Sequence, residues 1–545
     1  MMMILPRRRP VLSLSRRLLS HLIPGSPRSI PDSAHTSGGL YDFMQKTGKW
    51  CELEASHAAL VCLAAETPRV ITYAELPRRV SAAAHALKSM GFSQGDVVNI
   101  HLHNCEQFVV GYLAVAALGG TTTTSNPAYT GTELGMQQVD SGAKFVLSSR
   151  QYADAVSHAV SASGAASVSY IEDEACFANA PSTDAPLPPL ERPLDPGVDL
   201  LTVPYSSGTT GKPKGVMLSH LNVSVNILQL MVHIEGSGPQ MKKEDYVMGV
   251  LPLFHIYGMV VPFLTALCSQ STVVLLPKFE PVSFLEAMQK YNVNHGHFVP
   301  PIILFLAKHP VAKKYKLSSL RSICSAAAPL DANTQKSLSE ELGVPITQGW
   351  GMTELAPVAT IDRGGPPTPG SAGTLLPGTV GKVIDPNTLE ALPAGQPGEL
   401  CIAGPQVMLG YLNRPDATEQ TIMPDGFLRT GDNAYFDEAG HVYILDRLKE
   451  LIKVKGLQVA PAELEGRLLE LAEIVDAAVI GVPDERSGQL PKAFVVKKAG
   501  SQLDADQIKA ALAKTLAEYK VPAYIEFVDS IPKSPSGKIL RRTLK

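Results

Sequence analysis

The 545-residue chain lacks the excess of basic residues that is typical of nucleic-acid-binding proteins. Its 48 Lys and Arg against 51 Asp and Glu give a net charge of −3, so no basic field is available to attract DNA or RNA. Charged residues make up only 18% of the chain and apolar residues 45%. This composition is typical of a globular protein with a substantial core rather than of a disordered one. By length we expect about three or four structural units of about 150 residues each.

Cysteines are few and never form a C-x-x-C pair. Their odd number and their spacing argue against a disulfide scaffold or a zinc site and favour a reducing compartment. His295 and His297, in NHGHF, are spaced like metal ligands, but no further ligand motif lies near them in the sequence, so we interpret both as structural. The seven cysteines are at positions 51, 62, 105, 176, 268, 324 and 401.

An uninterrupted membrane-spanning run is also missing. Residues 249–268, GVLPLFHIYGMVVPFLTALC, contain no Asp, Glu, Lys or Arg over 20 positions, about the length that a spanning helix needs. Pro252, Gly258 and Pro262 interrupt this run, however. We therefore predict a buried strand, a turn and a buried helix, and no membrane span.

The first 32 residues have no acidic residue before Asp32, and they contain six arginines and five serines. The stretch VLSLSRRLLSHLI can form a basic amphipathic helix, whereas its apolar run is too broken for a secretory signal. Residues 1–32 therefore predict a targeting extension for a mitochondrion or a plastid. The alternative is an unstructured basic extension on a cytoplasmic protein. The C-terminal RRTLK is not the Ser-Lys-Leu peroxisomal signal.

Short apolar strands alternate with helical stretches from about residue 95, which predicts an α/β fold with largely parallel sheets. The Pro-rich stretch 180–197 predicts an exposed loop, and the Gly/Pro-rich turns of 366–445 predict an appended β-rich subdomain. We expect a large domain over 33–445 and a small, mobile α+β domain over 446–545. The expected strands are GDVVNIHL, KFVLSS, VSYIED, DYVMGVLPLF, STVVLLP, HGHFVPP, LRSICSA and GVPITQG, and the clearest helices are EQFVVGYLAVAALG and PVSFLEAMQKY.

One glycine-rich stretch has no acidic residue. Residues 206–216, SSGTTGKPKGV, hold three glycines, two lysines and four hydroxyl residues. They do not match a P-loop, because Ser206 stands where its first glycine should be and Pro213 follows Lys212. Glycines still allow an anion to approach the backbone closely, and hydroxyls and lysines bind it. We predict a polyphosphate-binding loop; the alternative is a solvated linker.

Further stretches supply the other groups that a nucleotide needs. In GWGMTEL, Trp350 offers a flat face for a purine, Thr353 a hydroxyl for phosphate, and Glu354 a carboxylate for Mg²⁺. FLRTGD ends in Asp432, which suits ribose hydroxyls. PKSPSGKIL carries Lys538 close to the end of the sequence given.

These stretches, together with GELCIAG and DRLKELIKVKGLQVAPAELE, occur in an order and at a spacing that resemble the adenylate-forming superfamily, most closely its 4-coumarate–CoA ligase-like branch. The resemblance runs from about residue 40 to the end. It implies an ATP-dependent acid–thiol ligase of phenylpropanoid metabolism. Such an enzyme activates 4-coumarate or a cinnamate-like acid to an acyl-AMP with ATP and Mg²⁺, and then transfers the acyl group to coenzyme A.

The alternatives are a medium- or long-chain fatty acyl-CoA synthetase, a luciferase-type acyl-adenylate monooxygenase, and a non-catalytic binder. The expected partners are small molecules, with no nucleic acid, and we expect a monomer or a weak dimer.

The resemblance also implies residue roles. Lys538 is the adenylation lysine and Lys453 acts in the thioester step, and a rotation about the hinge at Lys449 exchanges them. Glu354 and Thr353 are catalytic, Glu354 as the Mg²⁺ carboxylate, and His255 is the gate to the acyl pocket. The other implied acyl contacts are Tyr257, Ala327 and Gln458, and the coenzyme A contacts are Lys455 and Gly456. The implied ATP and AMP contacts are Ser206, Ser207, Gly208, Thr209, Thr210, Gly211, Lys212, Lys214, Gln348, Gly349, Trp350, Thr353, Asp432, Arg447, Lys449 and Lys538.

The acyl pocket is where the chain departs from plant 4-coumarate ligases. GMVVPF follows HIY in place of a polar run, and Ala326 and Ala403 replace the usual Gly and Arg. Gly258 and Val261 predict an apolar and deeper pocket, which favours a cinnamate with few hydroxyls or a medium-chain fatty acid. A single methyl changes selectivity by only about 10- to 200-fold in such a pocket.

Overall fold

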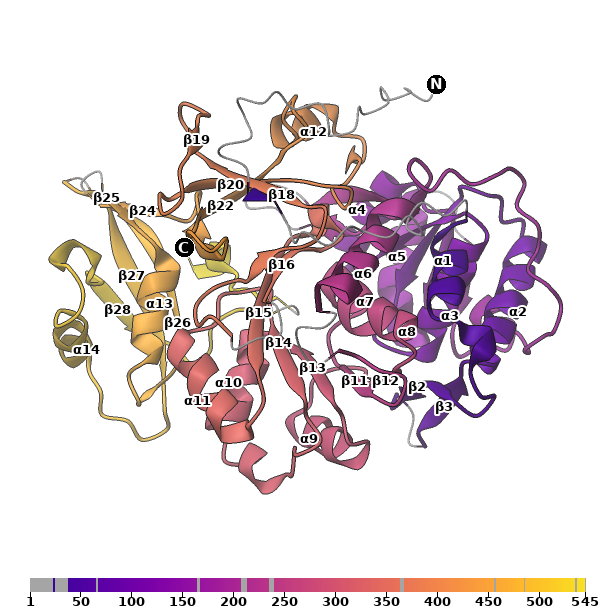
Figure 1. Cartoon of the computed structure of the whole chain (residues 1–545), viewed down its shortest axis with the longest axis horizontal. Helices are drawn as coiled ribbons and strands as arrows, with labels where there is room; N and C mark the ends of the chain where they lie inside the picture. Colours follow the sequence, from indigo (N-terminus) through magenta and orange to yellow (C-terminus); the bar gives the residue numbers. More distant parts are fainter. Residues whose placement is uncertain are drawn as a thin grey trace.

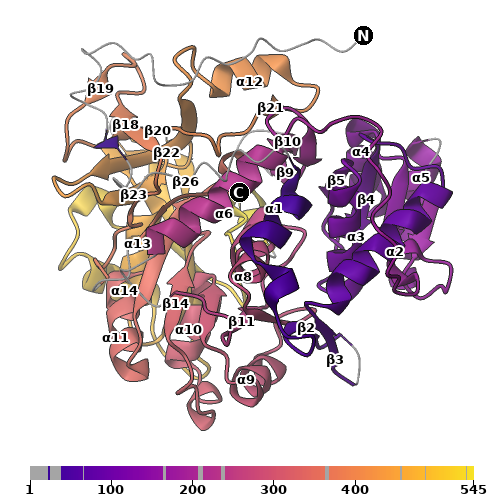
Figure 2. The same cartoon turned by 45° about the vertical axis from the view of Figure 1, so that its right-hand side comes forward.

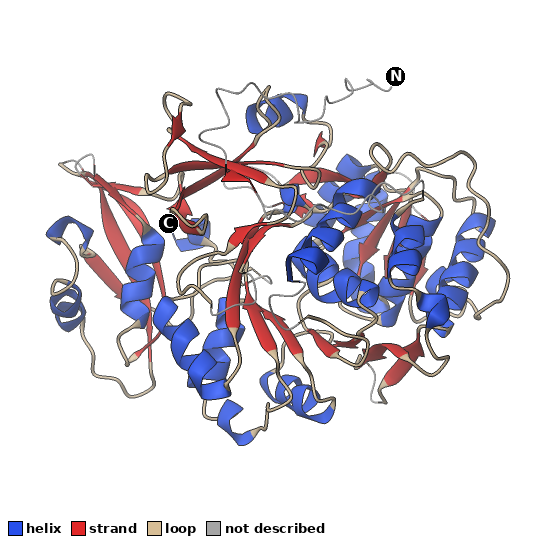
Figure 3. Cartoon of the chain, viewed as in Figure 1, coloured by secondary structure: helices blue, strands red, loops and turns tan. Residues whose placement is uncertain are grey.

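The computed structural model describes residues 23–24, 38–64, 67–163, 167–206, 213–234, 240–362, 367–454, 457–484, 486–534 and 537–544. These residues form four β-sheets with helices packed against them (Figures 1 and 3). Two large α/β sheets and a β-rich sheet make up the body of the molecule. The fourth sheet, formed by residues 452–527, lies to one side as the centre of a small domain.

The first large sheet has eight strands in the order β21-β10-β8-β5-β4-β6-β7, with β9 paired to β10. Its centre is parallel and its β10 edge antiparallel. The strands are β4 (Val97–His101), β5 (Thr121–Thr124), β6 (Phe145–Ser148), β7 (Ser167–Tyr170), β8 (Leu200–Thr202), β9 (Tyr205–Ser206), β10 (Lys214–Ser219) and β21 (Gly410–Tyr411). The associated helices are α2 (Glu75–Ser89), α3 (Glu106–Ala117), α4 (Gly131–Ser141) and α5 (Ala153–Ser163).

The second sheet has nine strands in the order β17-β16-β15-β14-β13-β11-β12-β2-β3, and it is parallel from β15 to β2. The strands are β2 (Ala58–Cys62), β3 (Arg69–Thr72), β11 (Tyr246–Gly249), β12 (Thr272–Leu275), β13 (His295–Phe298), β14 (Ser322–Ser325), β15 (Ile346–Gly351), β16 (Val358–Ile361) and β17 (Thr374–Leu375). Its crossover helices include α9 (Pro281–Lys290), α10 (Pro300–Lys308) and α11 (Ala332–Leu342).

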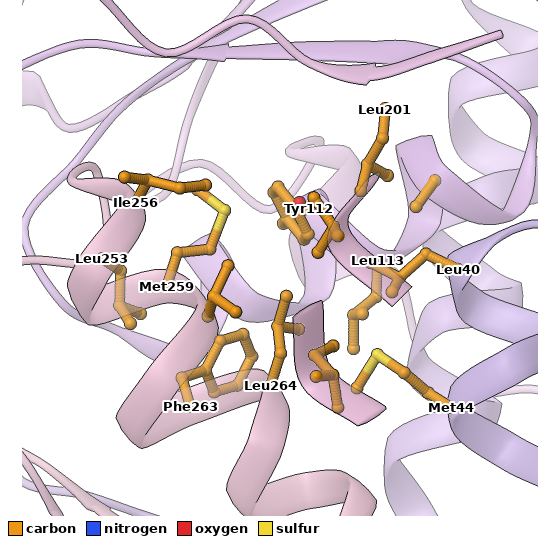
Figure 4. Packing of buried hydrophobic residues seen from close by; sticks show 14 of the residues in the cluster. Leu40, Met44, Tyr112, Leu113, Leu201, Leu253, Ile256, Met259, Phe263 and Leu264 are labelled. Atoms are coloured by element: carbon orange, nitrogen blue, oxygen red, sulfur yellow. The ribbon is translucent and has the colours of Figure 1, made fainter. Parts of the chain in front are cut away.

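The main core lies where these two sheets approach each other. Helix α1 (Leu40–Thr47), α3 and the helical segment 256–268 turn apolar side chains toward one another, as Figure 4 shows for Met44, Leu113 and Leu264. Helix α6 (His220–Ile234) contacts both α1 and α8 (Thr265–Cys268). Burying one such side chain contributes about 1.5–3 kcal/mol, so this contact holds the two sheets as one body.

A β-rich sheet lies at the top of the molecule in Figures 1 and 2. Its order is β1-β18-β20-β22-β23, with β19 paired to β18. The strands are β1 (Ile23–Pro24), β18 (Val380–Ile384), β19 (Ala391–Leu392), β20 (Gly398–Ala403), β22 (Leu428–Phe436) and β23 (Val442–Arg447); α12 (Pro415–Thr421) precedes β22. The short strand β1 falls inside the predicted targeting extension and pairs with β18; the rest of residues 1–32 lies outside the described residues.

The small domain is built on the fourth sheet, in the order β25-β24-β27-β26 with β28 parallel to β27. Its elements are β24 (Ile452–Val454), β25 (Leu457–Val459), α13 (Pro461–Leu469), β26 (Ile474–Asp484), β27 (Gly488–Lys497), α14 (Ala505–Leu512) and β28 (Tyr524–Phe527). Only residues 448–451 join it to β23 of the β-rich sheet. The proposed boundary at 445/446 therefore falls two residues before the end of β23.

The alternating pattern predicted the parallel strands and the helices α3 and α9 correctly, and the α/β class is confirmed. The apolar run 249–268 ends β11 and then forms the buried helical turns α7 (Ile256–Met259), a π-helical turn (Val260–Leu264) and α8, as predicted. Among the described residues, no helix is both long and apolar enough to cross a membrane. His295 bonds to Asp245 and to Ser322, which confirms its structural role.

Candidate active site

Lys538 lies at the tip of a hairpin that rests on the large domain. Its backbone pairs with Ser534, and Gly537 beside it has a φ of +78°. A Cβ on Gly537 would come within 3.1 Å of the side chain of Val299, just before α10. The hairpin therefore lies against the large domain, where Lys538 is close enough to the carboxylates of Asp432 and Glu354 for their charges to act on its ammonium.

Burial is the main influence on the charge of Lys538. Together with the nearby guanidinium of Arg447, burial lowers the pKa of Lys538 to about 8, while Asp432, Glu450 and Glu354 oppose that shift. A lysine whose pKa is close to neutrality remains an ammonium at pH 7 but is held in a poorly solvated site. Such a cation is suited to a phosphate or a carboxylate brought to it.

The carboxylate of Glu354 is held by two hydroxyl groups. It lies in a 3₁₀ turn (Thr353–Leu355) directly after β15. Its Oε1 accepts hydrogen bonds from Tyr411 at 2.8 Å and from Ser206, the last described residue before the glycine-rich loop, at 3.1 Å. Lys214, at the other end of that loop, places its ammonium over the Tyr411 ring at 4.7 Å. One end of the predicted phosphate loop thus contacts the predicted metal carboxylate directly, and the other end contacts the tyrosine that holds this carboxylate.

Asp432 forms a second carboxylate centre. The indole nitrogen of Trp350 donates to its Oδ2 at 2.9 Å, and Arg447 pairs with its Oδ1 at 3.2 Å. Burial raises the pKa of Asp432, an effect that Arg447 and Lys538 oppose. Strands β22 and β23 align Asp432 directly opposite Arg447, so sheet register brings these two groups together.

An apolar cavity opens beside these charged groups. Trp350 and Thr353 belong to its wall, so it adjoins both carboxylate centres. His255 stands at the start of α7 and is half-buried, and desolvation lowers its pKa to about 4, with a smaller effect from Lys538. This imidazole is therefore neutral at pH 7. The remaining lining residues are Leu230, Ile256, Tyr257, Val261, Cys324, Ala326, Ala327, Gly349, Gly351, Met352, Pro357, Val358 and Ile361.

One polar group faces this cavity without a partner. The side chain of Tyr257 is only 7% exposed, and its hydroxyl makes no hydrogen bond to the described residues. The thiol of Cys324 lies beside this hydroxyl. A buried hydroxyl without a partner carries a free-energy cost that a polar atom of a ligand would remove. The cavity is thus mainly apolar, and the Tyr257 hydroxyl is an unpartnered polar group in its wall.

Comparison with known proteins places this arrangement in a family. Residues 49–412 match the model of the AMP-binding enzyme, and residues 463–538 match the AMP-binding enzyme C-terminal domain. The chain belongs to the AMP-binding enzyme family. Its relatives include 4-coumarate-CoA ligase 1 of Narcissus pseudonarcissus, 40% identical over 88% of this chain and 89% of the relative, and 4-coumarate--CoA ligase 5 of Oryza sativa subsp. japonica, 41% identical over 86% and 87%.

The fold is also similar to solved structures. The ATP-bound MatB of Rhodopseudomonas palustris superposes with a TM-score of 0.84 at 30% identity, over 93% of this chain and 98% of that one. The large and small domains together, rather than one of them, are therefore similar to a protein that has been solved with ATP bound.

In this AMP-binding enzyme the predicted thioester lysine lies away from Lys538. Lys453 is exposed on β24, where its backbone nitrogen donates to Gln489. Together with Lys449 and Leu448 it lines an open, polar hollow on the small domain. Lys453 thus lines a hollow apart from the apolar cavity, whereas the charges of Asp432 and Glu354 act on Lys538.

Some predicted contacts take other positions. Gln348 turns its amide away from the cavity and bonds to Leu330 and Gln335 of the neighbouring helix region, so its side chain supports β15 internally. Gly349 and Ala327 line the cavity. Outside the described residues lie Ser207, Gly208, Thr209, Thr210, Gly211, Lys212, Lys455 and Gly456, and the side chain of Gln458 is not described.

The interpretation of Gly258 is wrong. A Cβ on Gly258 would meet the carbonyl oxygen of Pro252 at 2.3 Å, and Gly258 is not among the residues that line the cavity. This glycine allows α7 to pack closely on the preceding turn and does not deepen the pocket. Val261 does line the cavity, as the sequence predicted.

Sequence reasoning missed Tyr411. The residue stands in a GY pair of β21, which aligns Tyr411 with Val216 of β10, and this pairing brings its hydroxyl to Glu354. No local pattern marks the contact, because the two residues are 57 positions apart. An aromatic residue directly after a glycine, ahead of a helix that starts with Pro415, was the only available signal.

Proposed function

We propose that this enzyme is an acid–CoA ligase that activates 4-coumarate or a cinnamate-like acid as an acyl-AMP and then forms the CoA thioester. It uses ATP and coenzyme A, as CoA ligases of its family do. The observation that carries the proposal is the convergence of Lys538, Asp432 and Glu354 beside an apolar cavity. The 4-coumarate–CoA ligase relatives, at about 40% identity over most of the chain, support the same activity.

In the first step a carboxylate oxygen of the acid attacks the α-phosphorus of ATP, and pyrophosphate leaves with its bond electrons. Lys538 supplies positive charge to the carboxylate and the α-phosphate as they approach each other. Asp432 receives the ribose hydroxyls, and Trp350 and Arg447 hold its carboxylate in place. The apolar cavity takes the organic part of the acid and excludes water from the acyl-AMP.

Magnesium fits the groups around Glu354. The described residues contain no cluster of three or more His, Cys, Asp or Glu that could hold a metal by themselves. Mg²⁺ commonly binds through one or two carboxylates together with substrate phosphates. Glu354 accepts a hydrogen bond from Ser206, at one end of the phosphate loop, and from Tyr411, whose ring lies under the ammonium of Lys214 at the other end. When bound, Mg²⁺ would neutralise charge on the departing pyrophosphate. Glu354 would hold the ion, and Tyr411 would orient Glu354.

In the second step the thiol of coenzyme A attacks the acyl carbon and AMP leaves, with loss of the thiol proton. Lys538 occupies the site in the present arrangement, and Lys453 is exposed elsewhere. Turning the small domain within residues 448–451 would withdraw Lys538 and present Lys453, a closure-type motion about a few residues. The present arrangement is therefore the one that serves acyl-AMP formation.

The cavity favours a ring with a single polar substituent. Its walls are mainly apolar, and the Tyr257 hydroxyl lies beside the Cys324 thiol in them. A para hydroxyl of 4-coumarate can pair with Tyr257. The additional oxygens of sinapate would remain unpaired against Val261 and Val358, at a cost of about 1–3 kcal/mol each.

Two other activities share this site. A medium-chain acyl-CoA synthetase would use the same apolar wall, and a luciferase-type monooxygenase would oxidise the acyl-AMP with oxygen instead of passing it to coenzyme A. The unpartnered hydroxyl of Tyr257 favours the aromatic acid over the fatty acid. Oxygen consumption and light emission by the enzyme with acyl-AMP would identify the monooxygenase.

The test is a panel of acids assayed for pyrophosphate and for acyl-CoA. We expect 4-coumarate and cinnamate to be used best, sinapate poorly, and octanoate at a lower kcat/KM. Octanoate ahead by more than about tenfold, or about 1.4 kcal/mol, would assign the enzyme to the fatty-acyl class.

For localisation we propose that residues 1–32 direct the enzyme to a mitochondrion or a plastid. The composition of this segment, rich in arginine and serine with no acidic residue before Asp32, supports the proposal. Residues 1–32 fused to a fluorescent reporter should carry it into one of these organelles, and a protein lacking these residues should keep its turnover. A reporter that stays diffuse in the cytosol would favour the cytoplasmic alternative.

A further inference from the structure

Asp446 is a large-domain carboxylate that holds the small domain. It lies in β23, where it pairs with Asn433 of β22, and its side chain is only 6% exposed. Its Oδ1 accepts from the backbone of Arg447 at 2.7 Å, and its Oδ2 accepts from the backbone of Ala462 at 2.9 Å. Ala462 is the second residue of α13, in the small domain.

The bond from Ala462 to Asp446 crosses the connection between the domains. Backbone N–H groups in the first turn of a helix have no partner within it and carry partial positive charge, so a carboxylate is a favourable acceptor there. Asp446 belongs to the sheet before residues 448–451, and Ala462 belongs to the domain after them. Any turn of the small domain about this connection must break the bond.

Helix α13 transmits this contact toward Lys538. Glu465, one turn after Ala462, receives two hydrogen bonds of 2.8 Å from the guanidinium of Arg541. The same guanidinium donates to Glu450 in the connecting segment at 2.8 Å. Arg541 follows Lys538 by three residues, so the hairpin that carries Lys538 is fixed to the helix that Asp446 holds. Figure 1 shows α13 between the small-domain sheet and the body of the molecule.

We propose that Asp446 is a positioning residue for the first half-reaction, holding the small domain in the orientation that places Lys538 in the nucleotide site. It touches neither substrate nor nucleotide, and it acts through α13. The inference rests on the proposed function, since it assigns Asp446 to one of that function's two steps. Without the Asp446 carboxylate, the orientation that presents Lys453 gains population at the expense of the one that presents Lys538.

The charges around Asp446 are consistent with an ionised carboxylate at neutral pH. Burial raises the pKa of Asp446 to about 6, and Glu450 acts in the same direction, while the Ala462 N–H, Arg541 and the Arg447 N–H oppose it. Asp446 in turn acts on Glu465, whose pKa its charge raises. At pH 7.5 the side chain is therefore an anion facing a helix N-terminus and a guanidinium.

The first experiment compares the two half-reactions at pH 7.5 in the full-length enzyme. The substitution Asp446→Asn keeps the shape and an acceptor oxygen but removes the charge. We expect it to slow pyrophosphate release with acid and ATP by about tenfold, the size of one charge-assisted hydrogen bond. Conversion of supplied acyl-AMP to thioester should stay within about twofold or rise. Asp437→Asn is the matched control, because the Asp437 carboxylate bonds to His441 within the turn that joins β22 and β23, outside the connection to the small domain.

The second experiment measures the domain orientation itself. Spin labels at Lys336→Cys in α11 and Ala472→Cys in the small domain, with the exposed Cys51 changed to Ser, report the distance between the domains. In the present arrangement the two sites lie close together, because Asn333 bonds to Glu470. We expect one short distance in the otherwise unchanged protein and in Asp437→Asn, and a second, longer population in Asp446→Asn.

The outcomes separate this inference from the proposed function. If the unchanged enzyme makes no acyl-AMP with any acid, the proposed function fails. If it is active and Asp446→Asn slows both half-reactions equally or neither, the positioning role is wrong. A slower first step with an unchanged distance distribution would also overturn it, because Asp446 would then act locally. Asp446→Ala, with its fold checked by thermal unfolding, should exaggerate both effects.

Discussion

The indole N–H of Trp350 donates a hydrogen bond of 2.9 Å to Oδ2 of Asp432. Trp350 also belongs to the wall of the apolar cavity, so one side chain touches both the acid site and the group assigned to the ribose. This contact gives Trp350 a second role beside the purine-stacking one that its flat ring suggests. The two roles are separable by experiment.

Trp350→Phe keeps a flat face and removes the donor. We expect the KM for ATP to rise about tenfold, because a hydrogen bond to a charged group contributes about 1.5–3 kcal/mol. The KM for the acid should change less. If stacking were the only role of Trp350, the KM for ATP would be unchanged in Trp350→Phe. Steady-state kinetics with each substrate varied in turn distinguish the two.

The pKa of Lys538 predicts a pH dependence of the first step. Burial and Arg447 lower this pKa to about 8, and the step needs the ammonium form. Below pH 8 the lysine is charged; as the pH rises through 8 it loses its proton and its charge. We expect kcat/KM for acyl-AMP formation, which reports the free enzyme, to fall above about pH 8.

Lys538→Arg is the control for this profile. A guanidinium stays protonated over the whole range, so the variant should be slower but should lose the decline above pH 8. A decline of the same shape in Lys538→Arg would show that another group titrates.

Tyr411→Phe tests how Glu354 is positioned. The substitution removes the hydroxyl that bonds to Glu354 Oε1 and leaves Ser206 as the partner. We expect the Mg²⁺ concentration for half-maximal activity to rise about three- to tenfold, as for one lost hydrogen bond of about 1 kcal/mol. Calorimetric binding of ATP should weaken when Mg²⁺ is present and change little when it is absent.

Tyr443→Phe is the matched control for Tyr411, because Tyr443 stacks on Tyr435 at 4.9 Å, away from Glu354. If Tyr411→Phe weakened ATP binding equally with and without Mg²⁺, Tyr411 would not act by positioning Glu354 for the metal.

Tyr257→Phe tests substrate recognition. Its hydroxyl is buried in the cavity wall without a hydrogen-bond partner. We expect the ratio of kcat/KM for 4-coumarate to that for cinnamate to fall by about five- to tenfold, near 1 kcal/mol. Tyr112→Phe, which removes a buried unpartnered hydroxyl in α3, should leave this ratio unchanged. An unchanged ratio in Tyr257→Phe as well would mean that the para hydroxyl pairs elsewhere.

The sequence predicted those parts of the molecule whose signals are local. Alternating apolar runs marked β4, β6 and β11–β15, and the turns rich in Gly and Pro marked the β-rich sheet. It did not predict that β2 joins the second sheet, where Leu60 pairs with Val273, because such a pairing depends on the packing of distant segments. Helix α4 was not predicted from the sequence, although the residues of its capping box, Thr130 and Glu133, have the spacing that marks a helix start.

In the candidate site, too, local sequence signals marked some residues and not others. Lys538, Glu354 and Asp432 stand in short stretches whose residue types already suit a nucleotide, and the structure brings these three together. The partners that hold them were not predictable: Trp350 is 82 positions from Asp432, and Tyr411 meets Glu354 only through the pairing of β10 with β21. Gly258 was misread because a glycine that makes room for a ligand and one that makes room for a carbonyl look alike in a sequence.

The central claim is that one site performs two steps with two lysines, and the half-reactions of Lys538→Ala and Lys453→Ala test it most directly. Lys538→Ala should lose pyrophosphate release with 4-coumarate and ATP while still converting supplied 4-coumaroyl-AMP to the thioester. Lys453→Ala should do the reverse, because that lysine is exposed and is not a lining residue of the apolar cavity in the present arrangement. Loss of both half-reactions to the same extent in both variants would contradict the account.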